Sequence, residues 1–160
     1  MNEYTDHFTS HLGALLISGT IVICCVVMHY EALRLLGHAV GAHFHKRIGM
    51  LIVMLGLLAA HVIEIILFAL GYMVMQLLLG LGHITNLDNG SFLDYIYYSS
   101  VVYTTVGFGD LLPVGAVRML SAAEGLVGLA MITWSASFTF LAMKHFWPHP
   151  LNESSNRSSD

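Results

Sequence analysis

Long apolar runs separated by short polar connections dominate the chain, and three of these runs are long enough to cross a membrane. They cover residues 12–36, 48–81 and 114–146. An α-helix rises ~1.5 Å per residue, so about 20 residues span a hydrocarbon core of about 30 Å. The second run exceeds that length, and we expect its helix to be tilted or to project beyond the bilayer. The pattern therefore predicts three membrane-spanning helices.

A fourth stretch, residues 94–104, is apolar and aromatic but too short to span a membrane. A loop with the turn-forming residues Asn, Asp and Gly precedes it at 82–91. Irregular backbone at membrane depth is tolerated only where it is buried in protein or lines a water-filled cavity. We therefore expect residues 94–104 to form a re-entrant helix that is buried in protein.

Composition agrees with a membrane protein and excludes a soluble domain. Hydrophobic residues make up 56% of the chain and charged residues only 10%, with a mean hydropathy of +0.73, whereas a soluble domain has about 25% charged residues. The adjacent Cys24 and Cys25 lie in an apolar run, and neighbouring residues rarely form a disulfide. The predicted fold class is an all-α membrane protein, with these cysteines as packing residues.

Basic residues set the expected orientation in the membrane. Three of them flank the first connection, residues 37–47: Arg34, Lys46 and Arg47. The positive-inside rule makes this connection cytoplasmic. The N-terminal tail 1–11 and the loop 82–91 are then expected outside, and the polar tail 147–160, predicted to be disordered, in the cytoplasm. The expected location is the plasma membrane, specifically a bacterial inner membrane.

The connection after the re-entrant stretch, residues 104–110, reads Thr-Thr-Val-Gly-Phe-Gly-Asp. Glycines at alternate positions adopt positive φ without a Cβ clash, so successive carbonyl oxygens of a short loop can point to one side. Such a row of oxygens is a ligand for a dehydrated monovalent cation. Thr105 would add a hydroxyl oxygen at the inner end, while the side chains of Val106 and Phe108 are expected to point away and pack behind the loop.

This loop resembles the selectivity filter of potassium channels, in the phenylalanine-containing form common in two-pore-domain channels and many small bacterial ones. Three further segments share the resemblance: 92–102, 111–113 and 124–129. It implies a potassium channel pore module over residues 48–146 with these elements: outer helix 48–81, pore helix 94–104, filter 105–110 and inner helix 114–146. The helix 12–36 is additional to that pattern, and no segment has the regular arginines of a voltage sensor.

The resemblance implies the pore-forming subunit of a potassium-selective ion channel, and not an enzyme. Four residues would coordinate K⁺ through their carbonyl oxygens, with the Thr105 hydroxyl in addition: Thr105, Val106, Gly107 and Phe108. Gly109 completes the loop, and Asp110 would hold the outer mouth. One loop lines only part of a ring, so we expect a homotetramer with closed cyclic symmetry. The expected partners are K⁺ and membrane lipids, with no nucleic acid and no cofactor besides the permeant ion.

Two features of the inner helix are candidates for a gate and a cavity. Gly125 and Gly128 could allow a bend, and the resemblance favours Gly128 as the hinge; the alternative is that both only permit close helix packing. Four residues form one stripe that is expected to line the cavity: Leu129, Thr133, Ser137 and Leu141. The alternative for the two hydroxyl groups is a hydrogen bond back to their own helix.

His61 and Glu64 lie one turn apart on one face of the second helix. An ionisable residue at that depth is costly against lipid, so this face should be turned toward protein or water. One interpretation is a His–Glu hydrogen bond that only fixes helix packing. The other is that Glu64, supported by His61, braces the pore helix from behind and senses protons, since Phe108 has no hydroxyl to restrain the filter.

Ten histidines suggest other classes of function. His29 and His61 fall on membrane helices, as haem ligands would, and His43 with His45 could bind a transition metal. Neither pair has the closed ligand set of a structural metal site. The alternatives to a potassium channel are therefore a weakly selective cation channel, an auxiliary channel subunit, or a haem-binding membrane electron-transfer protein.

Overall fold

The computed structural model describes residues 2–41, 46–87 and 90–146. His43, His45 and the tail 147–160 lie outside these residues. The elements follow one another in this order: α1 (Asn2–Gly41), α2 (Lys46–Met73), the π-helix η1 (Val74–Leu78), β1 (Gly82–Ile84), α3 (Phe92–Tyr103), β2 (Pro113–Gly115) and α4 (Val117–Phe146).

Three helices are long and apolar enough to cross a membrane, as predicted. Their candidate spans are Phe8–His38, Ile48–Leu78 and Val117–Lys144. Helices make up 81% of the structure, which confirms the all-α membrane fold.

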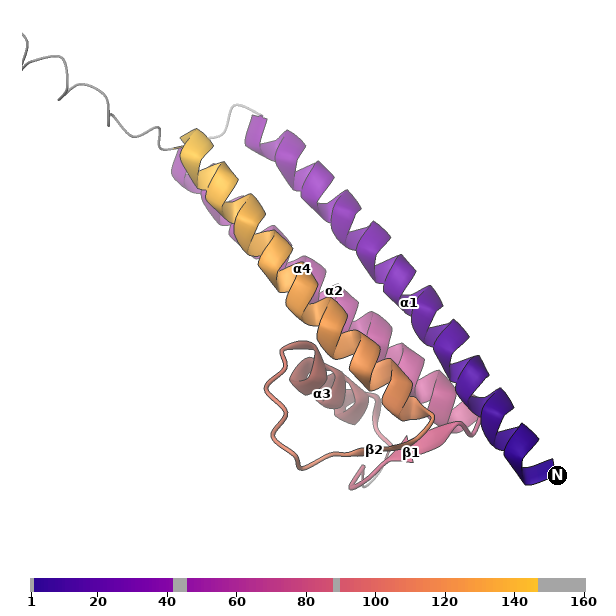
Figure 1. Cartoon of the computed structure of the whole chain (residues 1–160). Coiled ribbons are helices and arrows are strands. Elements are labelled where there is room, and N and C mark those ends of the chain that lie inside the picture. The colour runs from indigo at the N-terminus through magenta and orange to yellow at the C-terminus, as the bar shows by residue number, and fades with distance from the viewer. Residues whose placement is uncertain (1, 42–45, 88–89, 147–160) are drawn as a thin grey trace, which may run out of the picture.

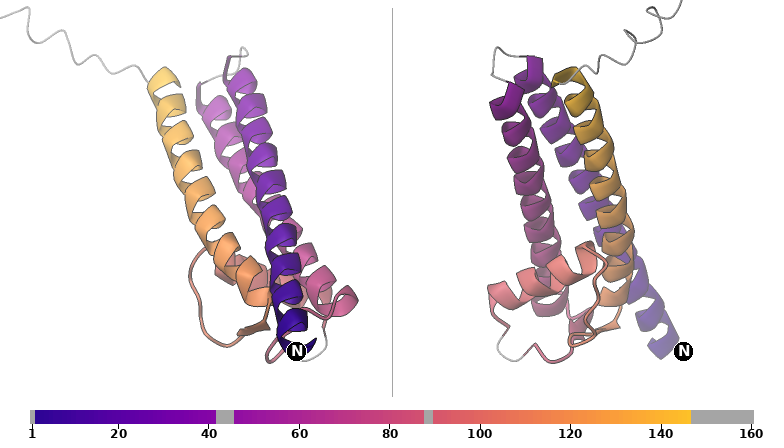
Figure 2. Two further views of the ribbon diagram at one scale, coloured as in Figure 1. Left: turned by 45° about the vertical axis from the view of Figure 1, so that its right-hand side comes forward. Right: turned by 90° about the vertical axis from the view of Figure 1, so that its left-hand side faces the viewer.

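The three long helices α1, α2 and α4 run side by side, with α1 packed on both α2 and α4 (Figures 1 and 2). The short helix α3 crosses one end of this bundle and packs against α2 and α4. The N-terminus, the β1–β2 ribbon and the loop after α3 lie at that same end (Figure 1). Helix α3 and the 104–110 loop therefore lie together at one end of the helix bundle.

Helix α1 packs through one stripe that consists mostly of small and polar residues and ends in Leu33. Its buried positions recur at helical spacing: Ala14, Ser18, Cys25, His29 and Leu33. The opposite face of α1 exposes large apolar side chains, as a lipid-facing surface does. Cys24 and Cys25 are both free thiols, the first exposed and the second buried.

A capping box starts α3. The Ser91 hydroxyl accepts a hydrogen bond from the Leu93 amide, and the Asp94 carboxylate accepts one from the Ser91 amide at 3.2 Å. These two bonds satisfy amide groups that lack partners inside the helix. As a result α3 begins at Phe92, two residues before the predicted start, and ends at Tyr103.

The long helices differ from their predicted bounds because hydropathy marks the hydrocarbon span and not the end of the helix. Helix α1 starts at Asn2 and continues to Gly41, so it includes most of the predicted tail 1–11 and the first part of the connection 37–47. Helix α2 starts at Lys46, and its regular hydrogen bonding ends at Met73. Polar residues continue a helix in water once the apolar part is formed.

A short antiparallel ribbon, which the sequence pattern did not predict, joins the ends of α2 and α4. β1 pairs with β2 in the register Gly82 to Gly115, His83 to Val114 and Ile84 to Pro113. The predicted helix starts at residue 114, but these residues are used by the ribbon and α4 begins at Val117. Strands of three residues are too short to show a period-two pattern.

Candidate functional site: the 104–110 loop and its supports

The backbone of the loop after α3 alternates in the sign of φ. Thr105, Gly107 and Gly109 have φ values of 58°, 55° and 82°. The two glycines thus adopt the positive φ that the sequence predicted. Thr105 also has positive φ, a backbone conformation that costs free energy in a residue with a Cβ atom. Alternation of this kind turns successive carbonyl groups toward the same side of the loop.

The amide groups of the loop bond inward, toward α3. The N–H groups of Val106 and Gly107 donate to the Val101 carbonyl oxygen at 3.1 and 3.3 Å. Among the described residues, no hydrogen bond reaches the carbonyl oxygens of residues 105–108. These oxygens are also on an exposed segment of the chain, so they are available as ligands.

The side chains of Val106 and Phe108 do not pack behind the loop in the single chain, although the sequence predicted that they would. In this single chain they are 54% and 69% exposed. Within the described residues α3 contacts the loop through main-chain hydrogen bonds, and neither side chain belongs to an apolar cluster. Their burial requires protein from outside this chain.

Two side chains hold the outer end of the loop at Asp110. The Tyr97 hydroxyl donates to the Asp110 carboxylate at 2.8 Å, and the Asn86 amide donates to the Asp110 carbonyl oxygen at 2.8 Å. The hydrogen bond to Asp110 raises the pKa of Tyr97, which keeps the phenol protonated as a donor. Asp110 is thus tied both to α3 and to the segment that follows β1.

Replacing Tyr97 with phenylalanine is expected to loosen the loop and, in the ion channel that the resemblance implies, to shorten the duration of current. The change removes the hydroxyl that restrains Asp110 and leaves the ring in place, so the loop loses one of its two outer side-chain bonds. The measurement is the decay of single-channel activity in planar bilayers. Tyr30→Phe, which removes a phenol hydroxyl from the exposed face of α1, is the matched control. Unchanged decay in Tyr97→Phe would show that the bond to Asp110 does not limit the open state.

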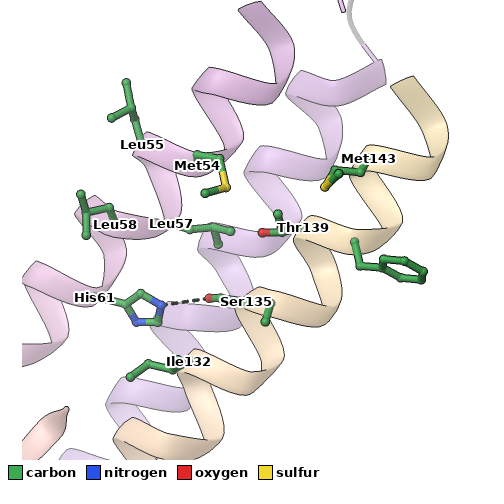
Figure 3. A pocket seen from close by; sticks show the side chains of 11 residues that line it. Met54, Leu55, Leu57, Leu58, His61, Ile132, Ser135, Thr139 and Met143 are labelled. Atoms are coloured by element: carbon green, nitrogen blue, oxygen red, sulfur yellow. Dashed lines mark hydrogen bonds between the residues drawn. The ribbon is translucent and has the colours of Figure 1, made fainter. Parts of the chain in front are cut away.

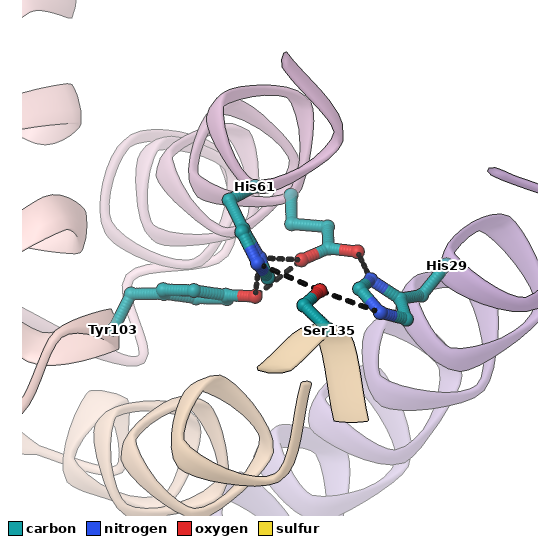
Figure 4. Close-up of polar contacts among 5 residues, drawn as sticks. His29, His61, Tyr103 and Ser135 are labelled. Atoms are coloured by element: carbon teal, nitrogen blue, oxygen red, sulfur yellow. Dashed lines mark hydrogen bonds and ion pairs between the residues drawn. The ribbon is translucent and has the colours of Figure 1, made fainter. Parts of the chain in front are cut away.

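A first polar network lies behind α3 and joins all four helices (Figure 4). We call it the four-helix cluster: His29 from α1, His61 and Glu64 from α2, Tyr103 from α3 and Ser135 from α4. Glu64 is fully buried. Its carboxylate contacts the Nδ1 atoms of His29 at 2.7 Å and His61 at 3.1 Å, and it accepts a hydrogen bond from the Tyr103 hydroxyl. The predicted pair His61 and Glu64 is therefore in contact, faces protein, and touches the end of α3.

A second polar network lies nearer the start of α4. The buried Glu124 carboxylate contacts the hydroxyl groups of Tyr72 and Ser99, each at 2.5 Å. Ser121 extends the network to the hydroxyl groups of Tyr72 at 3.2 Å and Tyr98 at 2.9 Å. Through these contacts α2 and α4 hold α3 from two sides.

The glycines of α4 are placed at its crossing with α3. A Cβ atom on Gly128 would collide with the Tyr103 carbonyl oxygen, whereas one on Gly125 would lie 3.8 Å from the Val102 carbonyl oxygen. The helix is continuous through both positions. The close-packing interpretation thus describes Gly128 in this structure, and a hinge there stays a proposal.

The predicted cavity stripe on α4 is exposed in the single chain: Leu129, Thr133, Ser137 and Leu141. It faces away from the bundle, because the buried side of α4 is formed by other residues. The Thr133 hydroxyl donates to the Leu129 carbonyl at 2.8 Å, and the Ser137 hydroxyl donates to the Thr133 carbonyl at 3.1 Å. Both hydroxyl groups therefore bond back to their own helix, as the alternative interpretation expected.

A groove of about 630 Å³ lies between α2 and α4 (Figure 3). Its walls are mostly apolar, with Leu57 and Leu58 on one side and Ile132 on the other. His61 and Ser135, joined by a hydrogen bond of 3.1 Å, border its end. The groove thus reaches the four-helix cluster.

The haem hypothesis for His29 and His61 does not fit this arrangement. The centroids of the two imidazole rings are 5.4 Å apart. Both rings contact the Glu64 carboxylate and the Ser135 hydroxyl. These groups occupy the space between the rings, so no porphyrin fits there.

Sequence reasoning gave no supporting role to several of the residues that hold the loop. His29, considered only as a haem ligand, and Glu124 carried a usable signal, since an ionisable residue within a membrane span marks a functional or paired site. Tyr103 and Ser135 carried no such signal, because tyrosine and serine are ordinary residues of membrane helices. Their roles depend on the way in which α3 and α4 pack against α2.

A sequence model of the ion channel family matches residues 58–144. The match covers 87 of 160 residues (144 − 58 + 1), from within α2 through α3 and the filter loop to the end of α4. Comparison with curated proteins and with solved structures gave no match. The match points to a transport protein rather than an enzyme. Since more than half of the chain is covered, and the fold is a multi-pass helical membrane fold, the protein belongs to the ion channel family.

Proposed function

We propose that this chain is the pore-forming subunit of a potassium-selective channel. The observation that carries the proposal is the loop backbone, with positive φ at Thr105, Gly107 and Gly109 and with carbonyl oxygens that no described residue occupies. The carbonyl oxygens of residues 105–108 and the Thr105 hydroxyl would replace the hydration shell of K⁺. Asp110 would add negative potential at the outer mouth.

The active form is a homotetramer in this proposal. A single loop provides ligands on one side of an ion, so four loops around an axis are needed to surround it. The exposed side chains of Val106 and Phe108 and the exposed stripe of α4 would then be covered by neighbouring subunits or line the central cavity. Gly128 is the proposed hinge of the inner helix, and Glu64 acts as a positioning residue that supports α3 through Tyr103.

The filter faces the outside of the cell in this proposal. The N-terminus and the filter loop lie at one end of the bundle, and Arg34, Lys46 and Arg47 belong to its other end or to the connection there. The positive-inside rule then puts the filter outside and the end of α4 inside a bacterial inner membrane.

Reconstitution in liposomes with a potassium gradient tests the function. The full chain is expected to dissipate the gradient, and bilayer recordings in mixed potassium and sodium solutions are expected to reverse near the potassium equilibrium potential. Equal permeability to both ions would support the second candidate, a weakly selective cation channel, which the missing hydroxyl at Phe108 favours. No flux of either ion would contradict both.

A further inference from the structure

Three side chains of metal-ligand type converge inside the bundle. One donor atom from each of His29, His61 and Glu64 lies within 4.8 Å of the others. His29 and Glu64 are fully buried, and the His61 side chain is 15% exposed. Two imidazoles and one carboxylate are a donor set that suits zinc and other divalent transition metals.

The polar contacts of the cluster can be satisfied in two ways. Glu64 contacts Nδ1 of both histidines, and the Ser135 hydroxyl contacts Nε2 of both, at 3.3 and 3.1 Å. Each neutral imidazole supplies one proton, Ser135 supplies one, and the Tyr103 hydroxyl, which contacts both Glu64 and Nδ1 of His61, supplies another. The cluster is therefore either a chain of hydrogen bonds that includes Tyr103 or the ligand set of a metal ion.

Ser135 favours the metal ion. Its hydroxyl oxygen has two lone pairs and can accept an Nε2–H group from each histidine. That arrangement leaves the Nδ1 lone pair of both rings free and directed toward Glu64. A metal-binding histidine usually donates its other N–H group to a fixed acceptor in this way.

We propose that His29, His61 and Glu64 form a buried binding site for a divalent transition metal ion of the zinc class. Zn²⁺ with bonds of about 2.0 Å holds neighbouring tetrahedral ligand atoms about 3.3 Å apart. The Nδ1 atom of His29 lies 2.7 Å from one carboxylate oxygen of Glu64, and that of His61 lies 3.1 Å from the other. One donor atom of each residue lies within 4.8 Å of the others, so side-chain rotation is needed to bring the three ligand atoms to that spacing. The Tyr103 hydroxyl, 3.0 Å from Nδ1 of His61, is the nearest further oxygen.

The site gives α1 a role in the channel. α1 lies outside the family match, yet it supplies His29, and the site is incomplete without it. The groove between α2 and α4 provides an opening, because His61 and Ser135 border it (Figure 3). Through Tyr103 the bound metal would fix the end of α3, directly before the filter.

Metal content of the purified full chain tests the proposal, independently of conduction. The protein, free of any affinity tag, is dialysed in detergent, analysed by elemental mass spectrometry, and titrated with Zn²⁺ against a chromophoric chelator. About one metal ion per chain is expected. His29→Gln, His61→Gln and Glu64→Gln should each lose this stoichiometric binding. Ser135→Ala keeps all three ligands and should weaken Zn²⁺ binding about 10–100-fold.

Two controls separate the buried site from other histidines. His83→Gln changes an exposed histidine on β1, and the double variant His43→Gln with His45→Gln changes the connection after α1; both should bind Zn²⁺ as the parent does. Helix content by circular dichroism identifies variants that fail to fold, and Ser135→Ala then decides. The proposal is overturned if the parent binds no Zn²⁺, or if Ser135→Ala and the ligand variants bind it normally, in which case the cluster is only a chain of hydrogen bonds.

Discussion

Replacing Gly107 with alanine is expected to abolish potassium-selective current. Gly107 has a φ of 55°, and no atom lies within 4 Å of the position that a Cβ would occupy. The effect is therefore conformational: an L-residue in this region costs about 1–2 kcal/mol, and in a tetramer the cost arises in all four copies. Rotation of the peptide planes around residue 107 relieves the strain but turns a carbonyl oxygen away from the ion.

Flux of K⁺ from liposomes and reversal potentials in mixed solutions measure this loss. Gly19→Ala is the matched control, since its Cβ position is also open but its φ is not positive. The control should conduct as the parent does. If Gly107→Ala retained the selectivity of the parent, the proposed alternation of carbonyl groups would not be the basis of ion binding.

Replacing Glu124 with alanine is expected to destabilise the fold and remove the current. The fully buried carboxylate receives the hydroxyl groups of Tyr72 and Ser99. Truncation leaves both hydroxyl groups without this partner and opens a cavity where α2, α3 and α4 meet, at a cost of about 2–5 kcal/mol. Because Ser99 belongs to α3, the helix that supports the filter also loses an anchor.

Glu124→Gln should keep most of the stability that Glu124→Ala loses. The Ser99 hydroxyl has one proton but two acceptors within reach, the Ile65 carbonyl at 2.8 Å and the Glu124 carboxyl group. The side-chain amide of this variant could donate its N–H group to Ser99, which then donates to Ile65, while the amide oxygen accepts from Tyr72.

Thermal unfolding in detergent, followed by circular dichroism, compares these variants. Glu31→Ala is the control, because Glu31 forms an exposed ion pair with Arg34 at 2.8 Å and such pairs contribute below about 1 kcal/mol. An alanine variant at position 124 that unfolds at the temperature of Glu31→Ala would contradict an anchoring role for the second network.

The membrane spans and the backbone conformation of the 104–110 loop could be predicted from the sequence because both depend on local properties of the chain. A run of about 20 apolar residues must form a helix in a bilayer, whatever surrounds it. The conformation of the loop follows from glycines at positions 107 and 109, whose backbone preference does not require distant contacts. The hydropathy pattern was less informative on helix ends, where α1 extends to Asn2 and α4 starts only at Val117.

The residues that support the 104–110 loop could be identified only from the tertiary structure. Sequence spacing put His61 and Glu64 on one face of a helix, and that face does touch α3. The remaining partners of the cluster are far away in the chain: His29 lies 35 residues from Glu64, and Ser135 lies 106 residues from His29. Contacts at such separations depend on the rotation and register of packed helices, which a hydrophobic pattern leaves open because every face of a membrane helix is apolar.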